Sequence, residues 1–261
     1  MLSKTRLLYL PPLFSRKPSL RIINYHWTPM EERSSLEQHF ETITQHYCSL
    51  DQNGLRAFLQ GKHRDPRNPI IISFDDGFRN NLEVASPLLE EYGLTGWFFV
   101  IGKAGYSDGH IVEGNLNTRY CMSWDELNLL RSKGHVIGCH TMNHVDLGSI
   151  DHSVLHHELV ASRQLIESEI GQSVLSFAYP YGTANSFSKA SMEMINATYE
   201  FAFHSFPSAI SPGHHPQALG RICVESGWSK DILQLRLNGF LDFRYRTPRN
   251  RFFRMLNETI Q

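Results

Sequence analysis

The sequence lacks several features that would place it in a specialised class of protein. Its 261 residues include only four cysteines, Cys48, Cys121, Cys139 and Cys223, and no C-x-x-C pair. This spacing indicates neither a cysteine-based zinc cluster nor a disulfide framework. The formal net charge of −1 gives no global argument for nucleic-acid binding. No apolar run reaches the length of a membrane-spanning helix.

The N-terminus has no export signal that we can identify. Basic residues precede a short apolar stretch, but Pro11 and Pro12 interrupt it before it reaches the length of a signal-peptide core. We therefore expect a cytoplasmic protein with reduced thiols.

Positive charge gathers at the two termini. Residues 1–30 contain no acid. The C-terminal stretch holds five arginines, Arg244, Arg246, Arg249, Arg251 and Arg254. Such a run of arginines usually forms a solvent-exposed helix face. The alternative is contact with an anionic partner, such as lipid headgroups at a membrane surface or a phosphate-bearing substrate.

Predicted strands and helices alternate along the chain. Strands are expected at 20–25, 69–74, 95–101, 135–139, 175–179 and 200–204, and helices at 36–47, 81–92, 123–134, 155–170 and 187–199. About six or seven such βα units predict an α/β barrel of parallel strands with outer helices. We divide the chain into an N-terminal extension (1–19), the barrel (20–230) and a basic helical segment (231–261).

Three short motifs directly follow predicted strands. They are Asp75-Asp76-Gly77, the run from His140 to His144, and Pro180-Tyr181-Gly182. The carboxyl ends of parallel strands meet at one edge of a sheet, so these motifs should converge. Two imidazoles and one carboxylate form a ligand set for a catalytic divalent cation with one coordination position open. The second carboxylate is then free to act as a base.

The three motifs, in this order, resemble those of the polysaccharide deacetylase family, the NodB-type carbohydrate esterases, over residues 20–225. The resemblance implies a distorted (β/α) barrel with seven strands. It also implies a metal-dependent hydrolase that removes N-acetyl groups from an N-acetylhexosamine-containing polysaccharide or glycoconjugate. Neither the glycan nor the oligomeric state is indicated.

The resemblance assigns a role to each matching residue. Asp76, His140 and His144 become the metal ligands, and Asp75 becomes the general base. We expect Zn²⁺, although the same ligands also accept Co²⁺, Ni²⁺ or Fe²⁺.

The third motif and two tryptophans are candidates for substrate binding. The resemblance places Pro180 and Tyr181 at the substrate and gives the backbone N–H of Tyr181 to the oxyanion. Flat rings complement the C–H face of a sugar, so Tyr181, Trp27 and Trp228 are candidates for a stacking platform. Aromatic side chains more often pack in the core than bind a ligand.

Two positions depart from the usual family pattern. Most members place the general-acid histidine near the C-terminus, but no histidine follows Arg221 here, whereas the strand at 20–25 leads into His26. This resembles the permuted branch that includes the poly-N-acetylglucosamine deacetylases, and we expect His26 to be the general acid. Ala178 stands where many members have an arginine that pairs with the base. Arg221, grouped here with the oxyanion and substrate-binding residues, is our candidate to replace that cation.

Three alternatives stay open from the sequence. An O-acetyl esterase would use the same oxyanion chemistry with a less demanding acid. A metal-free amidohydrolase is disfavoured by the pair His140 and His144. A catalytically silent sugar-binding protein would keep the barrel, and a His26 placed far from the other site residues would favour it.

Overall fold

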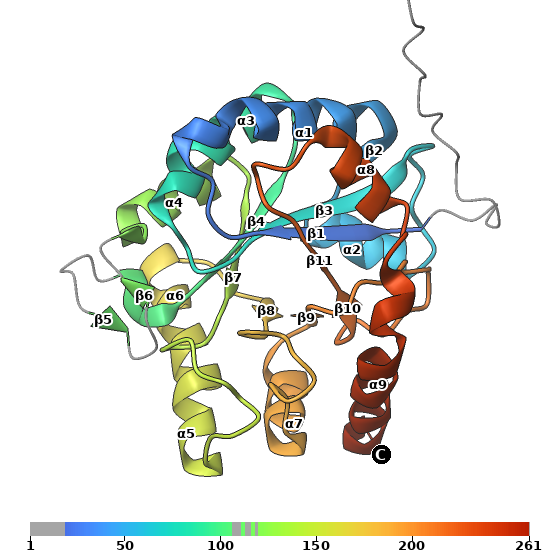
Figure 1. Ribbon diagram of the computed structural model, residues 1–261. Coiled ribbons are helices and arrows are strands. Elements are labelled where there is room, and N and C mark those ends of the chain that lie inside the picture. Colours follow the sequence, from blue (N-terminus) through green and yellow to red (C-terminus); the bar gives the residue numbers. More distant parts are fainter. Residues whose placement is uncertain (1–18, 106–110, 113–115, 118–119, 261) are drawn as a thin grey trace, which may run out of the picture.

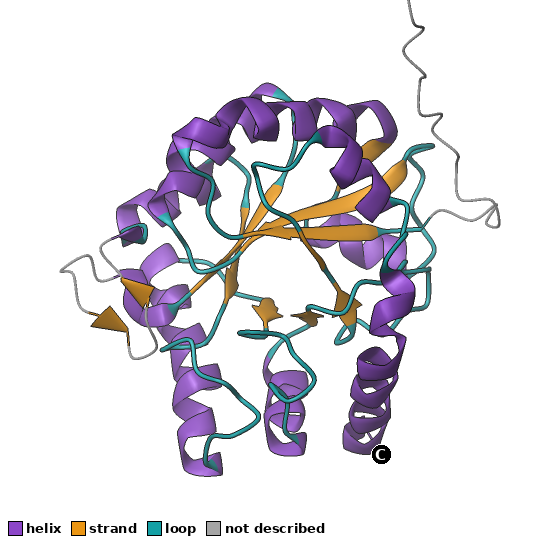
Figure 2. Ribbon diagram, viewed as in Figure 1, coloured by secondary structure: helices purple, strands orange, loops and turns teal. Residues whose placement is uncertain are grey.

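The computed structural model describes residues 19–105, 111–112, 116–117 and 120–260. Its centre is a curled parallel sheet surrounded by helices (Figures 1 and 2). The main sheet contains β1 (Arg21–Tyr25), β2 (Tyr47–Ser49), β3 (Asn68–Phe74), β4 (Gly96–Val100), β7 (Val136–Cys139), β8 (Ser176–Ala178), β9 (Phe201–His204), β10 (Leu219–Gly220) and β11 (Ile222–Cys223). A separate antiparallel pair is formed by β5 (Ile111–Val112) and β6 (Leu116–Asn117).

One short run of chain joins the two ends of this sheet. The strand order is β10-β9-β8-β7-β4-β3-β1-β11, with β2 paired to β3 outside the ring. β10 pairs with β9 and β11 pairs with β1, and only Arg221 separates β10 from β11. Counted as one, these two pieces give seven barrel positions in the described part of the chain. The predicted distorted (β/α) barrel of seven strands is confirmed.

The helices largely follow the sequence pattern. They are α1 (Arg33–His46), α2 (Gln52–Leu59), α3 (Ser86–Glu91), α4 (Trp124–Ser132), α5 (His152–His156), α6 (Ser162–Ile170), α7 (Lys189–Thr198), α8 (Lys230–Leu237) and α9 (Arg246–Ile260). Ser123 and Glu126 form the predicted capping box of α4. Gly171 ends α6 in the left-handed conformation, at φ 64°. No helix among the described residues is long and apolar enough to cross a membrane.

Some elements differ from the sequence prediction. Two predicted α-helices contain a π-helical turn, η2 (Asn81–Ala85) before α3 and η5 (His157–Ala161) between α5 and α6. α2 was not predicted, because Asp51-Gln52-Asn53-Gly54 has the composition of a turn. In the structure Asp51 caps the helix by accepting a hydrogen bond from the Gly54 N–H.

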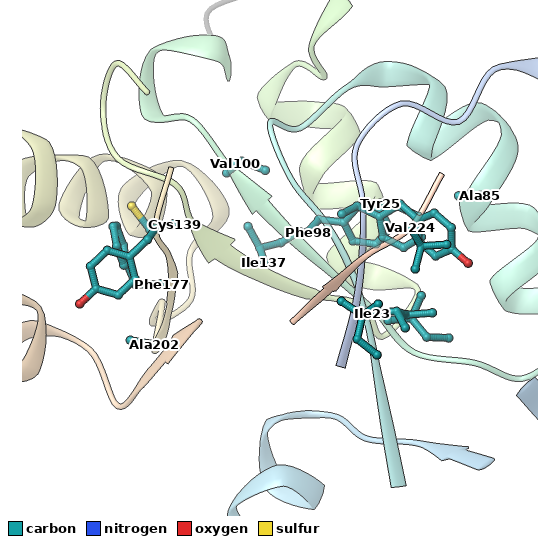
Figure 3. Packing of buried hydrophobic residues seen from close by; sticks show 14 of the residues in the cluster. Ile23, Tyr25, Ala85, Phe98, Val100, Ile137, Cys139, Phe177, Ala202 and Val224 are labelled. Carbon is teal, nitrogen blue, oxygen red and sulfur yellow. The ribbon is translucent and has the colours of Figure 1, made fainter. Parts of the chain in front are cut away.

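Alternation along the strands divides the apolar core into two layers. Ile22 and Ile71 belong to the cluster inside the barrel, with Trp97, Phe99, Phe203 and Leu219. Their neighbours Ile23 and Ile72 belong to the larger cluster between strands and helices. Figure 3 shows this outer layer, including Tyr25, Phe98 and Cys139. The alternation therefore predicts which strand residues face the barrel interior.

The C-terminal helices pack on the barrel. Leu233 and Leu237 of α8, and Phe252 and Leu256 of α9, are buried in the outer cluster. Four of the five C-terminal arginines are exposed, while Arg249 donates a hydrogen bond to the carbonyl of Pro207 at 2.7 Å. The segment boundaries at 19/20 and 230/231 stay predictions, and residues 1–18 lie outside the described part.

The free energy of unfolding is expected to fall as the pH is lowered from 7 to 5. Burial lowers the pKa of His135 from 6.5 to about 4, and that of His204 from 6.5 to about 3. Below pH 6.5 the unfolded chain therefore binds protons that the folded protein does not. Each histidine contributes a loss of about 2 kcal/mol by pH 5.

Urea unfolding at the two pH values measures this loss. A His204→Gln variant should lose less stability than the wild type between pH 7 and pH 5. If the wild type and His204→Gln lose the same free energy of unfolding between pH 7 and pH 5, His204 does not contribute to the loss.

Candidate active site

The candidate site residues meet at the carboxyl ends of the strands. Asp75 and Asp76 follow β3, and His26 follows β1. The His26 Nε2 lies 3.9 Å from Asp75 Oδ2, and the His140 Nε2, after β7, lies 4.0 Å from the same oxygen. The ring of Tyr181, after β8, lies 4.9 Å from that of His144. The ends of β1, β3, β7 and β8 thus contribute to one site.

Asp75 is held by a buried arginine. Arg221 Nη1 donates to Asp75 Oδ1 at 2.7 Å, and Nη2 donates to Oδ2 at 2.8 Å. Both residues are almost completely buried, at 1% exposure for Arg221 and 2% for Asp75. Asn24 Nδ2 adds a hydrogen bond to Oδ2 at 2.9 Å. Parallel hydrogen bonds of this kind fix the carboxylate plane as well as its charge.

The contact between Arg221 and Asp75 has the geometry expected of a cation that substitutes for an arginine at Ala178. Arg221 reaches Asp75, the predicted base, from the β10–β11 run, which pairs with β9 and β1, so it supplies a cation at the predicted base from a strand other than the one that carries Ala178. Burial alone would raise the pKa of Asp75, but the Arg221 charge and hydrogen bonds outweigh it and keep the pKa well below its usual range. Asp75 is therefore ionised at neutral pH.

Asp76, His140 and His144 face a common point. Asp76 Oδ1 lies 3.6 Å from His140 Nε2 and 3.3 Å from His144 Nε2. This oxygen is buried, yet it has no hydrogen-bond partner among the described residues. Zinc bonds of 2.0–2.1 Å in tetrahedral geometry separate two ligand atoms by about 3.4 Å. The donor set therefore fits a divalent cation.

The protonation of these residues is consistent with cation binding. Burial lowers the pKa of His140 to about 3 and also lowers that of His144, so both imidazoles are neutral at pH 7. His140 Nδ1 lies 2.7 Å from the carbonyl of Ala178, which makes Nδ1 the donor and leaves the Nε2 lone pair for a ligand. Burial raises the pKa of Asp76 to about 7, a cost that a nearby cation would remove.

Backbone strain coincides with the motifs. Among the described residues, four non-glycine residues have a positive φ angle: Asp76 at 69°, Thr141 at 67°, His144 at 57° and Tyr181 at 59°. Left-handed backbone costs a non-glycine residue free energy, and such residues cluster at functional sites. All three motifs carry this signature.

Exposed aromatic side chains surround the site. Trp27 and Tyr181 are 44% and 52% exposed, and Tyr120 is 47% exposed with its ring 5.8 Å from that of Trp27. The cation of Arg236 lies 5.9 Å from the Trp228 ring, which packs on the outer core instead. Trp27 and Tyr181 thus remain candidates for sugar stacking, and Tyr120 joins them.

Two polar residues that the motifs did not indicate, Asn24 and Ser73, support Asp75. Ser73 Oγ donates to Asn24 Oδ1 at 2.8 Å, and Arg221 Nη1 donates to the same oxygen at 3.0 Å. Asn24 and Ser73 stand two positions before His26 and Asp75, on the same strand face. A polar residue at that spacing in an apolar strand was the available signal.

Comparison with known proteins assigns the family. The sequence profile described as polysaccharide deacetylase matches residues 62–200, more than half of the chain. This protein belongs to the polysaccharide deacetylase family.

Individual relatives agree with that assignment. The chain is 25% identical over 224 residues to YxkH of Bacillus subtilis (strain 168), which is named for the same family, and the match covers 82% of this chain and 75% of YxkH. It is 23% identical over 197 residues to the poly-β-1,6-N-acetyl-D-glucosamine N-deacetylase of Staphylococcus aureus (strain N315), covering 71% of this chain and 65% of that protein.

Solved structures show the same fold. The Streptococcus pyogenes deacetylase PplD, in complex with acetate, superimposes with a TM-score of 0.71 at 18% identity, over 85% of this chain and 99% of PplD. IcaB from Ammonifex degensii superimposes with a TM-score of 0.63 at 20% identity, over 79% of this chain and 92% of IcaB.

Proposed function

We propose that this protein hydrolyses N-acetyl groups of an N-acetylhexosamine-containing polysaccharide or glycoconjugate, with a divalent cation held by Asp76, His140 and His144. The observation that carries the proposal is the convergence of these three ligand atoms beside an arginine-held carboxylate, Asp75. Membership of the deacetylase family supports the reaction class. The name of the staphylococcal relative supports the choice of an N-acetylated glycan.

The protein's own residues divide the proton transfers between them. When bound, the cation supplies Lewis acidity that makes water a better nucleophile and an acetyl carbonyl a better electrophile. Asp75 accepts the proton of the attacking water, and Arg221 and Asn24 hold Asp75 in place for this step. The water oxygen bonds to the acetyl carbon, and the C–N bond then breaks to release acetate and an amine.

We assign the protonation of that amine to His26. Its side chain is about half exposed, and its Nε2 lies 3.9 Å from Asp75 Oδ2, which supports this assignment. This position supports catalysis over a silent sugar-binding role. We assign the backbone N–H of Tyr181 to the oxyanion, and Pro180, which precedes it, to the same substrate-binding turn.

Stripping the protein of metal is expected to abolish acetate release, and returning Zn²⁺ should restore it. Protein treated with a chelator is assayed on N-acetylglucosamine oligomers and on acetylated xylan, before and after addition of Zn²⁺, Co²⁺, Ni²⁺ or Fe²⁺. The proposal expects release from the amide substrate that depends on added metal. Asp76→Asn serves as the ligand-deficient reference.

Two results would contradict this proposal. Unchanged activity in metal-free protein would remove the metal dependence. Release from acetylated xylan alone would favour the O-acetyl esterase. The predicted cytoplasmic location and membrane contact stay predictions.

A further inference from the structure

A buried carboxylate outside the ligand set holds the loop that carries both histidines. Glu158, in η5, is 1% exposed. Its Oε2 accepts hydrogen bonds from the backbone N–H groups of Met142 and Asn143, each at 3.0 Å. Its Oε1 accepts one from Asn143 Nδ2 at 2.6 Å. Three donors of the segment between His140 and His144 thus converge on one side chain.

This contact stabilises a strained piece of backbone. Thr141 and His144 both have a positive φ, and His144 N–H donates to Thr141 Oγ1 at 2.9 Å. Consecutive N–H groups aimed at one oxygen form an anion-binding concavity, which the Glu158 carboxylate fills. Without it, the two amides would lose their partner and the loop could relax.

The π-helical turn that contains Glu158 also contacts the strand before the loop. Ser162, directly after the turn, lies with its Oγ 3.2 Å from the Sγ of Cys139, the residue that precedes His140. The hydroxyls of Ser162 and Tyr199 donate to the carbonyls of Glu158 and Leu159, each at 2.6 Å. These hydroxyls thus bond two carbonyls of the turn, and π-helical turns often occur at functional sites.

The formal charges around the site favour a divalent cation. Three buried carboxylates, Asp75, Asp76 and Glu158, stand against one buried guanidinium, that of Arg221, a difference of two negative charges. The groups that bond Glu158 are neutral amides. Buried charge is costly unless it is compensated, and a dication at the ligand set would compensate it.

We propose that Glu158 is a positioning residue of the metal site: it fixes the loop that presents His140 and His144, and its negative charge favours a divalent cation there. This inference rests on the metal-dependent function proposed above. Replacing a residue that orients metal ligands without binding the metal itself typically weakens metal affinity by about 10- to 100-fold.

The test is the Zn²⁺ dissociation constant of metal-stripped protein, measured by competition with a chromogenic chelator. Glu158→Gln should weaken binding by about 10- to 100-fold. Glu169→Gln, an exposed glutamate of α6, is the control and should stay within about twofold of the wild type. The Zn²⁺-induced rise in Tm should also be smaller in Glu158→Gln than in the control.

The outcomes separate this inference from the proposed function. A folded Glu158→Gln variant with wild-type affinity, even with a lower Tm, would show a purely structural role and overturn the inference alone. A wild-type protein without measurable Zn²⁺ binding would overturn both. Should Glu158→Gln not fold, Asn143→Ala decides, because it removes only the side-chain donor. A loss of about three- to tenfold is expected there, and unchanged affinity would overturn the inference.

Discussion

Replacing Arg221 by methionine is expected to lower kcat for acetate release by about 100-fold or more. The variant leaves Asp75 buried without the two hydrogen bonds that fix its orientation and charge. Misplaced or protonated, the carboxylate cannot accept a proton from water, and such proton transfer is typically worth about 10²- to 10⁴-fold in rate. Removing one partner of a buried ion pair also costs about 3–5 kcal/mol of stability.

The chain contains a matched control for this experiment. Arg21 forms a similar pair of hydrogen bonds with Asp242, at 2.7 and 3.2 Å, and is 4% exposed. It lies at the first residue of β1, whereas His26 and the candidate site follow the last. Arg21→Met should therefore lower the free energy of unfolding and leave kcat within about twofold of the wild type. Equal loss of kcat in both variants would show that Arg221 acts only through stability. Arg221→Lys, which keeps the charge without the planar fork, should retain only part of the activity.

Replacing His26 by alanine is expected to lower kcat on an N-acetyl substrate by about 10²- to 10⁴-fold. An amine is a poor leaving group unless it is protonated, and His26 is the group that we assign to this step. On an aryl acetate the loss should be far smaller, because a phenolate departs without a proton. The measurement is the ratio of the two rates in wild type and variant.

His156→Ala controls for the loss of a histidine as such, because His156 is exposed on α5. It should leave both rates unchanged. An equal fall of both rates in His26→Ala would argue against its role as general acid and point to a role in substrate binding.

Local sequence was sufficient for the strand ends and for the choice of candidate metal ligands. An apolar run followed by polar residues places Asp75, Asp76 and His140 at strand ends. Because side chains alternate between the two faces of a strand, Cys139 points into the outer core. The capping box at Ser123 was also visible, because all of its hydrogen bonds join residues three apart. Such features depend on neighbours in the chain, which a single sequence contains.

Contacts between distant segments could not be predicted in the same way. Arg221 and Asp75 are 146 positions apart, and their pairing depends on the run that joins β9 to β1. The side chain of Glu158 reaches Asn143 from a π-helical turn that the helical pattern did not indicate. The sequence by itself determined which residues could bind a cation and transfer protons. The tertiary structure alone decided which arginine holds Asp75 and which glutamate holds the loop between His140 and His144, because barrel closure and helix packing bring those groups together.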